Sequence, residues 1–141
     1  MKRKILVVDD NKKTCDFLTE IFAEQGYQTF SALSGQLALD TVKKKKPELV
    51  LLDIKMPKMD GIDVLRRIKR INKDVVVVMI TGYGALDTAK EAMRLGAYEY
   101  VTKPFDLDFI KAVIRDALSE RKPQRLLREQ DETSNVESPL V

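Results

Sequence analysis

The chain of 141 residues is long enough for one ordinary domain and too short for two. Hydrophobic residues make up 44% and charged residues 33%, so we expect a buried core and a polar surface. One cysteine and no histidine exclude a disulfide framework, a Cys- or His-based zinc site, a Ser-His-Asp triad and a phosphohistidine on this chain. The net charge of +3 is too small to argue for nucleic-acid binding.

The apolar runs of the sequence are short. The longest are Leu49–Leu52 and Val75–Ile80, far below the ~18–20 residues that a membrane-spanning helix needs. A basic start, Lys2-Arg3-Lys4, precedes an apolar stretch that is too short for a signal peptide and ends at Asp9. We therefore expect a soluble cytoplasmic protein without a membrane segment.

Apolar runs and amphipathic stretches alternate along the chain. Five runs predict strands: Ile5–Val8, Tyr27–Phe30, Leu49–Leu52, Val75–Ile80 and Tyr98–Val101. The first, third and fourth are continuously apolar, as expected of strands covered on both faces, whereas the other two suit sheet edges. The stretches between and after them have helical spacing, with predicted buried faces at Cys15/Leu18/Ile21/Phe22, Leu37/Ala38/Val42 after a Ser34 N-cap, Ile62/Leu65/Ile68, Leu86/Ala89/Met93 and Ile110/Val113/Ile114/Ala117.

A chain of alternating strands and helices can form either a closed barrel or an open sheet. A barrel needs eight units and about 250 residues, whereas this array has five units in about 120 residues. We therefore predict an α/β, flavodoxin-like, doubly wound (βα)5 fold with a five-stranded parallel sheet in the order 2-1-3-4-5. This domain is expected over residues 1–122. Residues 123–141 are predicted to form a polar and mostly flexible tail, the alternative being a helical extension through Leu126, Leu127 and Arg128.

Polar side chains follow four of the predicted strands. In an open parallel sheet, ligands bind beyond the carboxyl ends of the strands where the strand order reverses, here between strands one and three. The side chains expected at that rim are Asp9, Asp10, Asp53, Thr81 and Lys103. Two carboxylates about 4 Å apart repel by about 4 kcal/mol at an effective dielectric constant of ~20, so three of them require a cation or a shifted pKa. Mg²⁺ suits such an oxygen-rich site, which indicates a phosphoryl-transfer centre with a carboxylate as candidate nucleophile.

Four segments of the sequence carry a family resemblance. They are Ile5–Asp10, Leu51–Gly61, Ile80–Gly84 and Gly96–Phe105. With these four segments in this order and at this spacing, the sequence resembles the receiver domain of bacterial two-component response regulators over roughly residues 3 to 121. The resemblance implies that the chain is a phosphoacceptor signalling protein of a phosphorelay and that it catalyses only its own phosphorylation and dephosphorylation.

The resemblance also assigns roles to individual residues. Asp53 is implied to be the phosphoacceptor, and Mg²⁺ is implied to be held by Asp9, Asp10, Asp53 and the backbone carbonyl of Lys55. The phosphoryl group is implied to be contacted by Lys103 and by the hydroxyl of Thr81, and Tyr100 is implied to be an aromatic switch. A cis peptide is expected at Lys103–Pro104. Lys55 and Tyr83 are expected to hinder the water that hydrolyses the aspartyl phosphate.

The partners follow from the same resemblance. The phosphoryl donor is expected to be a histidine kinase or a histidine phosphotransfer protein, because this chain has no histidine. Phosphorylation is expected to change the surface of the fourth helix, the fifth strand and the fifth helix, which would bind a downstream protein or a second copy of the chain. Direct binding of nucleic acid or membrane is not expected.

Three alternatives compete with this interpretation. The chain could be a receiver domain excised from a longer transcriptional regulator with ATPase and DNA-binding domains, which Thr81–Gly84 and Val101–Phe105 favour. A Mg²⁺-dependent phosphatase with an aspartate nucleophile would need a second aspartate at the position of Lys55. A flavin or dinucleotide module would need a phosphate-binding loop where Asp9 and Asp10 stand, and these carboxylates repel phosphate.

Overall fold

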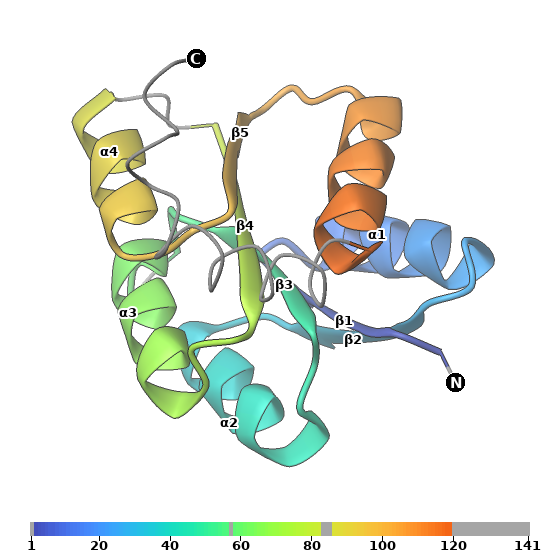
Figure 1. Ribbon diagram of the computed structural model, residues 1–141, viewed down its shortest axis with the longest axis horizontal. Coiled ribbons are helices and arrows are strands. Elements are labelled where there is room, and N and C mark those ends of the chain that lie inside the picture. The colour runs from blue at the N-terminus through green and yellow to red at the C-terminus, as the bar shows by residue number, and fades with distance from the viewer. Residues whose placement is uncertain (1, 57, 83–85, 120–141) are drawn as a thin grey trace, which may run out of the picture.

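The computed structural model describes residues 2–56, 58–82 and 86–119 (Figure 1). Five parallel strands form one sheet in the order β2-β1-β3-β4-β5, which confirms the predicted fold class. The strands are β1 (Lys4–Val8), β2 (Gln28–Ala32), β3 (Leu49–Asp53), β4 (Val76–Thr81) and β5 (Glu99–Thr102). The two less apolar strands, β2 and β5, lie at the sheet edges, as their composition predicts.

Helices cover both faces of this sheet (Figure 1). They are α1 (Lys12–Glu24), α2 (Gly35–Lys45), α3 (Gly61–Ile71), α4 (Leu86–Arg94) and a further helix at residues 107–119. α2, α3 and α4 pack on one face, while α1 and the helix at residues 107–119 pack on the other. No helix among the described residues is both long and apolar enough to span a bilayer.

The period-two geometry of the strands divides the core into two clusters. In β1, Leu6 and Val8 face α2 and α3, whereas Ile5 and Val7 face α1. All residues of β3 are buried, because this central strand is covered on both faces. The continuous apolar runs of the sequence therefore reflect burial on both sides of the sheet.

Short polar side chains start three of the helices. The side chain of Asn11 accepts a hydrogen bond from the N–H of Thr14, and the side chain of Asp60 accepts one from the N–H of Asp63. Ser34 caps α2 as predicted, because its hydroxyl oxygen accepts a hydrogen bond from the N–H of Leu37. Such caps satisfy N–H groups that have no partner within the helix.

Two predicted helix faces are wrong in detail. In α2, Leu37 is 52% exposed, and the buried face instead includes Leu39. In α4, Met93 is 46% exposed and its neighbour Ala92 is fully buried. Both errors have one cause: helical spacing alone does not decide which of several nearby apolar residues face the sheet, and tertiary packing makes that choice.

The turns that lead from helices into strands lie on the rim opposite the carboxyl ends. Gly26 (φ 98°) closes the connection from α1 to β2, and Gly96 (φ 102°) closes the connection from α4 to β5. Positive φ favours glycine because a side chain would clash with the backbone there. The tail at residues 123–141 and its boundary at residue 122 lie outside the described residues and stay predictions.

Candidate functional site

Three carboxylates meet at the carboxyl ends of β1 and β3. Asp9 and Asp10 follow β1, and Asp53 ends β3. Each offers an oxygen atom that lies within 4.8 Å of those of the other two. Thr81, the last residue of β4, borders Asp53 in a pocket that also includes Lys55, Gly82 and Lys103. The side chains that the sequence placed at one rim are thus brought together by the fold.

The strand register produces this convergence. Val8 of β1 pairs with Leu52 of β3, so the next residues along the two strands, Asp9 and Asp53, leave the sheet side by side. Asp53 in turn pairs with Ile80 of β4, which places Thr81 one residue further along the neighbouring strand. The carboxylate of Asp9 is also oriented locally, because its Oδ1 accepts a hydrogen bond from the N–H of Asn11 at 2.9 Å.

Lys103 brings a positive charge to the carboxylates from the end of β5. Its Nζ lies 3.0 Å from Oδ2 of Asp9 and 3.9 Å from Oδ2 of Asp53. The N–H of Lys103 donates to the carbonyl of Thr81, which ties the segment after β5 to the end of β4. The peptide between Lys103 and Pro104 is cis, as expected from the sequence.

The site is shielded on one side and open on the other. Asp9 is 5% exposed, Asp53 is 7% exposed and Thr81 is fully buried, whereas Asp10 and Lys55 reach the solvent. Burial and the neighbouring charge of Asp9 raise the pKa of Asp53 above its ordinary value, although Lys103 and the N–H of Lys55 oppose the shift. The carboxylate of Asp53 is therefore in a site with excess negative charge.

This donor set fits a hard divalent cation. Three carboxylates share the ammonium of Lys103, so a bound cation would compensate the remaining negative charge. Oxygen ligands and an open, solvent-facing side are what Mg²⁺ requires, because it keeps several water molecules. Lys55, whose carbonyl is the fourth predicted ligand, is held beside Asp53: its N–H donates to Oδ1 of that residue at 3.3 Å.

Two aromatic residues have predicted roles near the site. Tyr100 of β5 is half-buried and packs against the core cluster under α2, α3 and α4, and burial raises its pKa. Its role as a switch stays a prediction. Tyr83 lies outside the described residues, so its predicted effect on water attack also stays a prediction.

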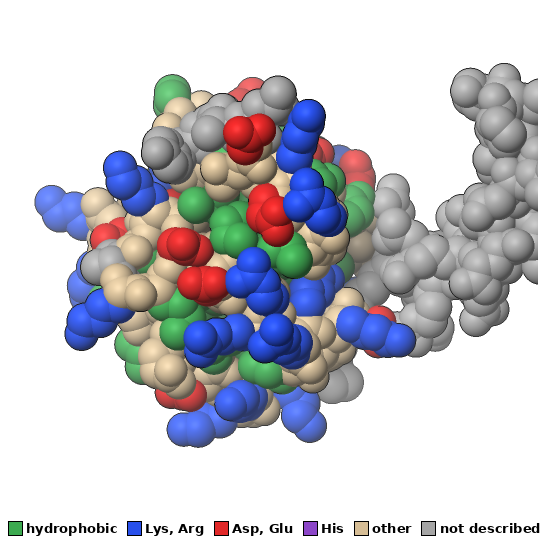
Figure 2. Space-filling view, turned by 90° about the vertical axis from the view of Figure 1, so that its left-hand side faces the viewer, with side chains coloured by type: hydrophobic (Ala, Val, Ile, Leu, Met, Phe, Trp, Pro, Cys, Tyr) green, Lys and Arg blue, Asp and Glu red, His purple; other side chains and the backbone are tan. Residues whose placement is uncertain are grey.

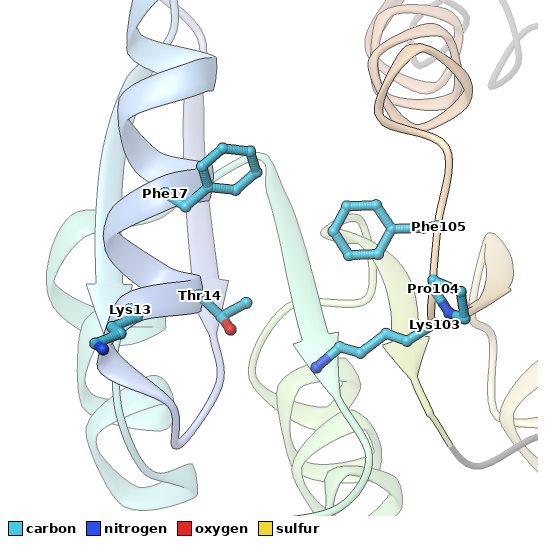
Figure 3. Close-up of a pocket in the computed structure, with 6 residues that line it drawn as sticks. All are labelled: Lys13, Thr14, Phe17, Lys103, Pro104 and Phe105. Atoms are coloured by element: carbon cyan, nitrogen blue, oxygen red, sulfur yellow. The ribbon is translucent and has the colours of Figure 1, made fainter.

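Sequence reasoning missed a groove beside the carboxylates. It has a volume of about 420 Å³ and is lined by Lys13, Thr14, Phe17, Lys103, Pro104 and Phe105. Figure 3 shows Phe17 of α1 and Phe105 facing each other across it, with the amine of Lys103 extending toward the strand ends. Phe17 is 51% exposed. In the sequence, Phe17 lies outside the apolar stripe formed by Cys15, Leu18 and Phe22, and this position could have indicated an exposed ring.

The order of the strands and the acidic rim with its lysine and threonine define a receiver-type α/β domain. Residues 5–115 match the family described as the response regulator receiver domain, which is more than half of the chain. The chain belongs to this family, whose members are the receiver domains of two-component response regulators.

Two curated relatives differ in length. The sporulation initiation phosphotransferase F of Bacillus subtilis is 47% identical over 118 residues, which cover 84% of this chain and 95% of the relative. The regulatory protein AtoC of Escherichia coli is 38% identical over 89% of this chain, but the chain spans only 27% of its length. Several other curated relatives are also covered over about a quarter of their length.

Solved structures show the same fold. A response regulator receiver domain protein (CheY-like) from Methanospirillum hungatei superposes with a TM-score of 0.85 at 27% identity, covering 88% of this chain and 99% of that chain. The CheX-CheY-BeF3-Mg+2 complex from Borrelia burgdorferi matches with a TM-score of 0.78 at 32% identity, covering 82% and 89%. That second structure is thus a complex in which Mg²⁺ and BeF3 accompany the two proteins.

Proposed function

We propose that this receiver domain accepts a phosphoryl group on Asp53 from a phosphohistidine of a partner protein and signals through the resulting change of charge. One observation carries the proposal: the nearly buried carboxylate of Asp53 lies 3.9 Å from the ammonium of Lys103 and within 4.8 Å of two further carboxylates. Asp53 is thus a nucleophile beside a positive charge and a candidate metal site.

The transfer step uses this chain's own residues. A carboxylate oxygen of Asp53 attacks the phosphorus, a P–O bond forms, and the P–N bond to the histidine breaks while the imidazole keeps its electron pair. The ammonium of Lys103 stabilises the negative charge of the phosphoryl oxygens, and the hydroxyl of Thr81 serves as a further donor. Mg²⁺ held by Asp9, Asp10, Asp53 and the carbonyl of Lys55 supplies further charge neutralisation when bound.

The groove between α1 and the segment after β5 fits the donor protein. It shares Lys103 with the site, so a protein seated in it would lie next to Asp53. The ring of Phe17, which is 51% exposed, offers an apolar contact in this groove. The partner proposed here is a histidine kinase or a histidine phosphotransfer protein, because this chain has no histidine to carry the group itself.

Phosphorylation would add a charge of about −1.5 to −2 at the rim. Thr81 and Lys103 are the side chains placed to respond, and β4, α4 and β5 are the elements connected to them. The surface of α4, β5 and the helix at residues 107–119 is therefore the proposed site for a downstream protein or a second copy. Figure 2 shows the face over α3 and α4, where basic side chains gather in the lower half of the view and acidic side chains lie mainly above them. The small net charge of +3 does not favour nucleic acid.

A second arrangement is compatible with the same chemistry. The chain spans only about a quarter of several longer regulators, which supports the alternative that it acts as the receiver part of a protein with ATPase and DNA-binding domains. In either arrangement we propose a cytoplasmic protein that catalyses no reaction beyond its own phosphorylation and dephosphorylation.

Intact mass spectrometry tests the proposal after incubation with a small-molecule phosphodonor and Mg²⁺. We expect a single phosphoryl adduct that is absent from Asp53→Asn and is suppressed by a chelator. Asp74→Asn, which removes an exposed carboxylate outside the cluster, should retain the adduct. An adduct of undiminished yield on Asp53→Asn would refute the assignment. Phe17→Ala should slow transfer from a phosphohistidine protein but not from the small phosphodonor.

A further inference from the structure

The loop between β3 and α3 is closed at its base by a glycine. The N–H of Gly61, the first residue of α3, donates a hydrogen bond to the carbonyl of Ile54 at 2.6 Å. Ile54 directly follows Asp53 in the chain. The start of α3 therefore rests on the peptide that follows the proposed phosphoacceptor.

No side chain fits at position 61. A Cβ atom built on Gly61 would lie 2.5 Å from the Cα of Ile54, and it would also overlap the carbonyl oxygen of Asp53. Both neighbours are backbone atoms, so no change of rotamer can relieve the overlap. The requirement for glycine here arises from close approach, and even alanine would force α3 and the loop apart.

The packing of α3 limits how far the helix itself can shift. The α3 side chains Val64, Leu65 and Ile68 are all fully buried in the core, so a shift of α3 would disturb close packing. The loop carries the exposed residues Lys55 and Lys58, although Ile54 and Met56 are buried in the same core cluster. A displacement caused at position 61 would therefore act first on the peptide between Asp53 and Ile54, whose atoms the new Cβ would overlap.

A chain of contacts leads from this loop to the site. Gly61 holds Ile54, Ile54 precedes Lys55, and the N–H of Lys55 lies 3.3 Å from Oδ1 of Asp53. We propose that Gly61 is a positioning residue of the phosphoacceptor site. Because α3 packs closely against the backbone of Ile54, the N–H of Lys55 stays hydrogen-bonded to the Asp53 carboxylate and the Lys55 carbonyl is held in place for Mg²⁺. This inference rests on the proposed function and concerns how the backbone carbonyl of Lys55 is held in place for Mg²⁺.

Calorimetric titration of the whole chain with Mg²⁺ tests the proposal. Gly61→Ala should weaken Mg²⁺ binding about tenfold, as loss of an outer support of metal ligands does. The amide resonance of Lys55 should shift in the same variant. Gly26→Ala is the matched control, because its φ of 98° makes the substitution strained while its Cβ would meet no atom within 4 Å. It should lower Tm and leave Mg²⁺ affinity unchanged.

Equal Mg²⁺ affinity of folded Gly61→Ala and the wild type would overturn the proposal, whatever happens to Tm. If Gly61→Ala does not fold, Gly35→Ala tests the same loop from α2, because its Cβ would lie 2.9 Å from Sδ of Met59 and 2.8 Å from Cγ2 of Val64. A smaller loss of Mg²⁺ affinity is then expected, and unchanged affinity counts against the idea. Wild-type protein that binds no Mg²⁺ would refute the metal site itself, which distinguishes the two failures.

Discussion

Replacing Asp53 by asparagine should stabilise the metal-free protein against unfolding near neutral pH. The substitution keeps the shape of the side chain and an acceptor for the N–H of Lys55, while it removes one charge from the carboxylate cluster. In the unfolded chain the same carboxylate is surrounded by water and is distant from Asp9. The folded state alone therefore bears the repulsion that the substitution relieves.

The magnitude follows from the distances. At 4.8 Å, the upper limit of their separation, Asp9 and Asp53 repel by roughly 3.5 kcal/mol at an effective dielectric constant of ~20. The attraction between the Lys103 ammonium and the Asp53 carboxylate, at 3.9 Å, stabilises the charged form by about 4 kcal/mol by the same estimate. Asp10 adds repulsion that its exposure screens, and the burial of Asp53, which is only 7% exposed, adds a desolvation penalty. The first two energies nearly cancel, so the net gain of about 2 kcal/mol that we expect for Asp53→Asn comes mainly from the desolvation penalty and from Asp10.

The pH dependence has a defined sign. Because folding raises the pKa of Asp53, its protonation favours the folded state, and that contribution is lost as the pH rises through the raised pKa. The advantage of Asp53→Asn should therefore be present at pH 7 and shrink as the pH falls toward the ordinary aspartate pKa of about 3.9. Mg²⁺ should stabilise the wild type more than the variant, because it binds the folded carboxylates.

Thermal unfolding monitored by circular dichroism in the presence of a chelator measures the effect. For a domain of this size a gain of about 2 kcal/mol corresponds to an increase of Tm by roughly 6 °C. Asp74→Asn is the control, and as an exposed substitution outside the cluster it should change stability by less than about 0.5 kcal/mol. If Asp53→Asn has the same Tm as the wild type, or a lower one, the electrostatic reasoning about the cluster is wrong.

Three further predictions concern other parts of the fold. Burial raises the pKa of Cys15 to about 11, so a thiol reagent near pH 8 should label it only after unfolding, and fast labelling of native protein would contradict this. Asp60→Ala removes the N-cap of α3 and should lower the free energy of unfolding by about 1 kcal/mol in a urea titration. An unchanged free energy of unfolding would show that this cap does not stabilise the helix. Ile114→Ala in the fully buried part of the helix at residues 107–119 should cost about 2–4 kcal/mol in the same assay, and a cost below that of Asp60→Ala would argue against its place in the core.

The fold could be predicted because strand burial has an unambiguous pattern. Continuous apolar runs such as Leu49–Leu52 require cover on both faces, and a chain of five strand–helix units, three of them with such runs, has few ways to provide it. The helix faces were less certain, since Leu37 and Leu39 differ by two positions and only tertiary packing decides which is buried. The cluster of Asp9, Asp10 and Asp53 followed from the rule that the ends of parallel strands share one rim.

Other features of the site depend on contacts between distant segments. The groove beside Lys103 forms only when α1 and the segment after β5 lie next to each other, so the place of Phe17 outside the apolar stripe of α1 indicates an exposed ring but not the groove itself. The requirement for glycine at position 61 arises from two backbone atoms at the end of β3 and could not be inferred from turn preferences. Sequence patterns thus predicted the residues of the acidic rim, while the contacts that hold these residues in place depend on tertiary packing.

The turn at Gly26 offers a practical opportunity for engineering. It lies on the rim opposite the carboxylates, separated from them by a five-residue strand whose length is about 17 Å. The glycine is exposed, and the adjoining helix is closed by its own hydrogen bonds. A dye or an affinity tag inserted there should report on the molecule or immobilise it without covering the carboxylates.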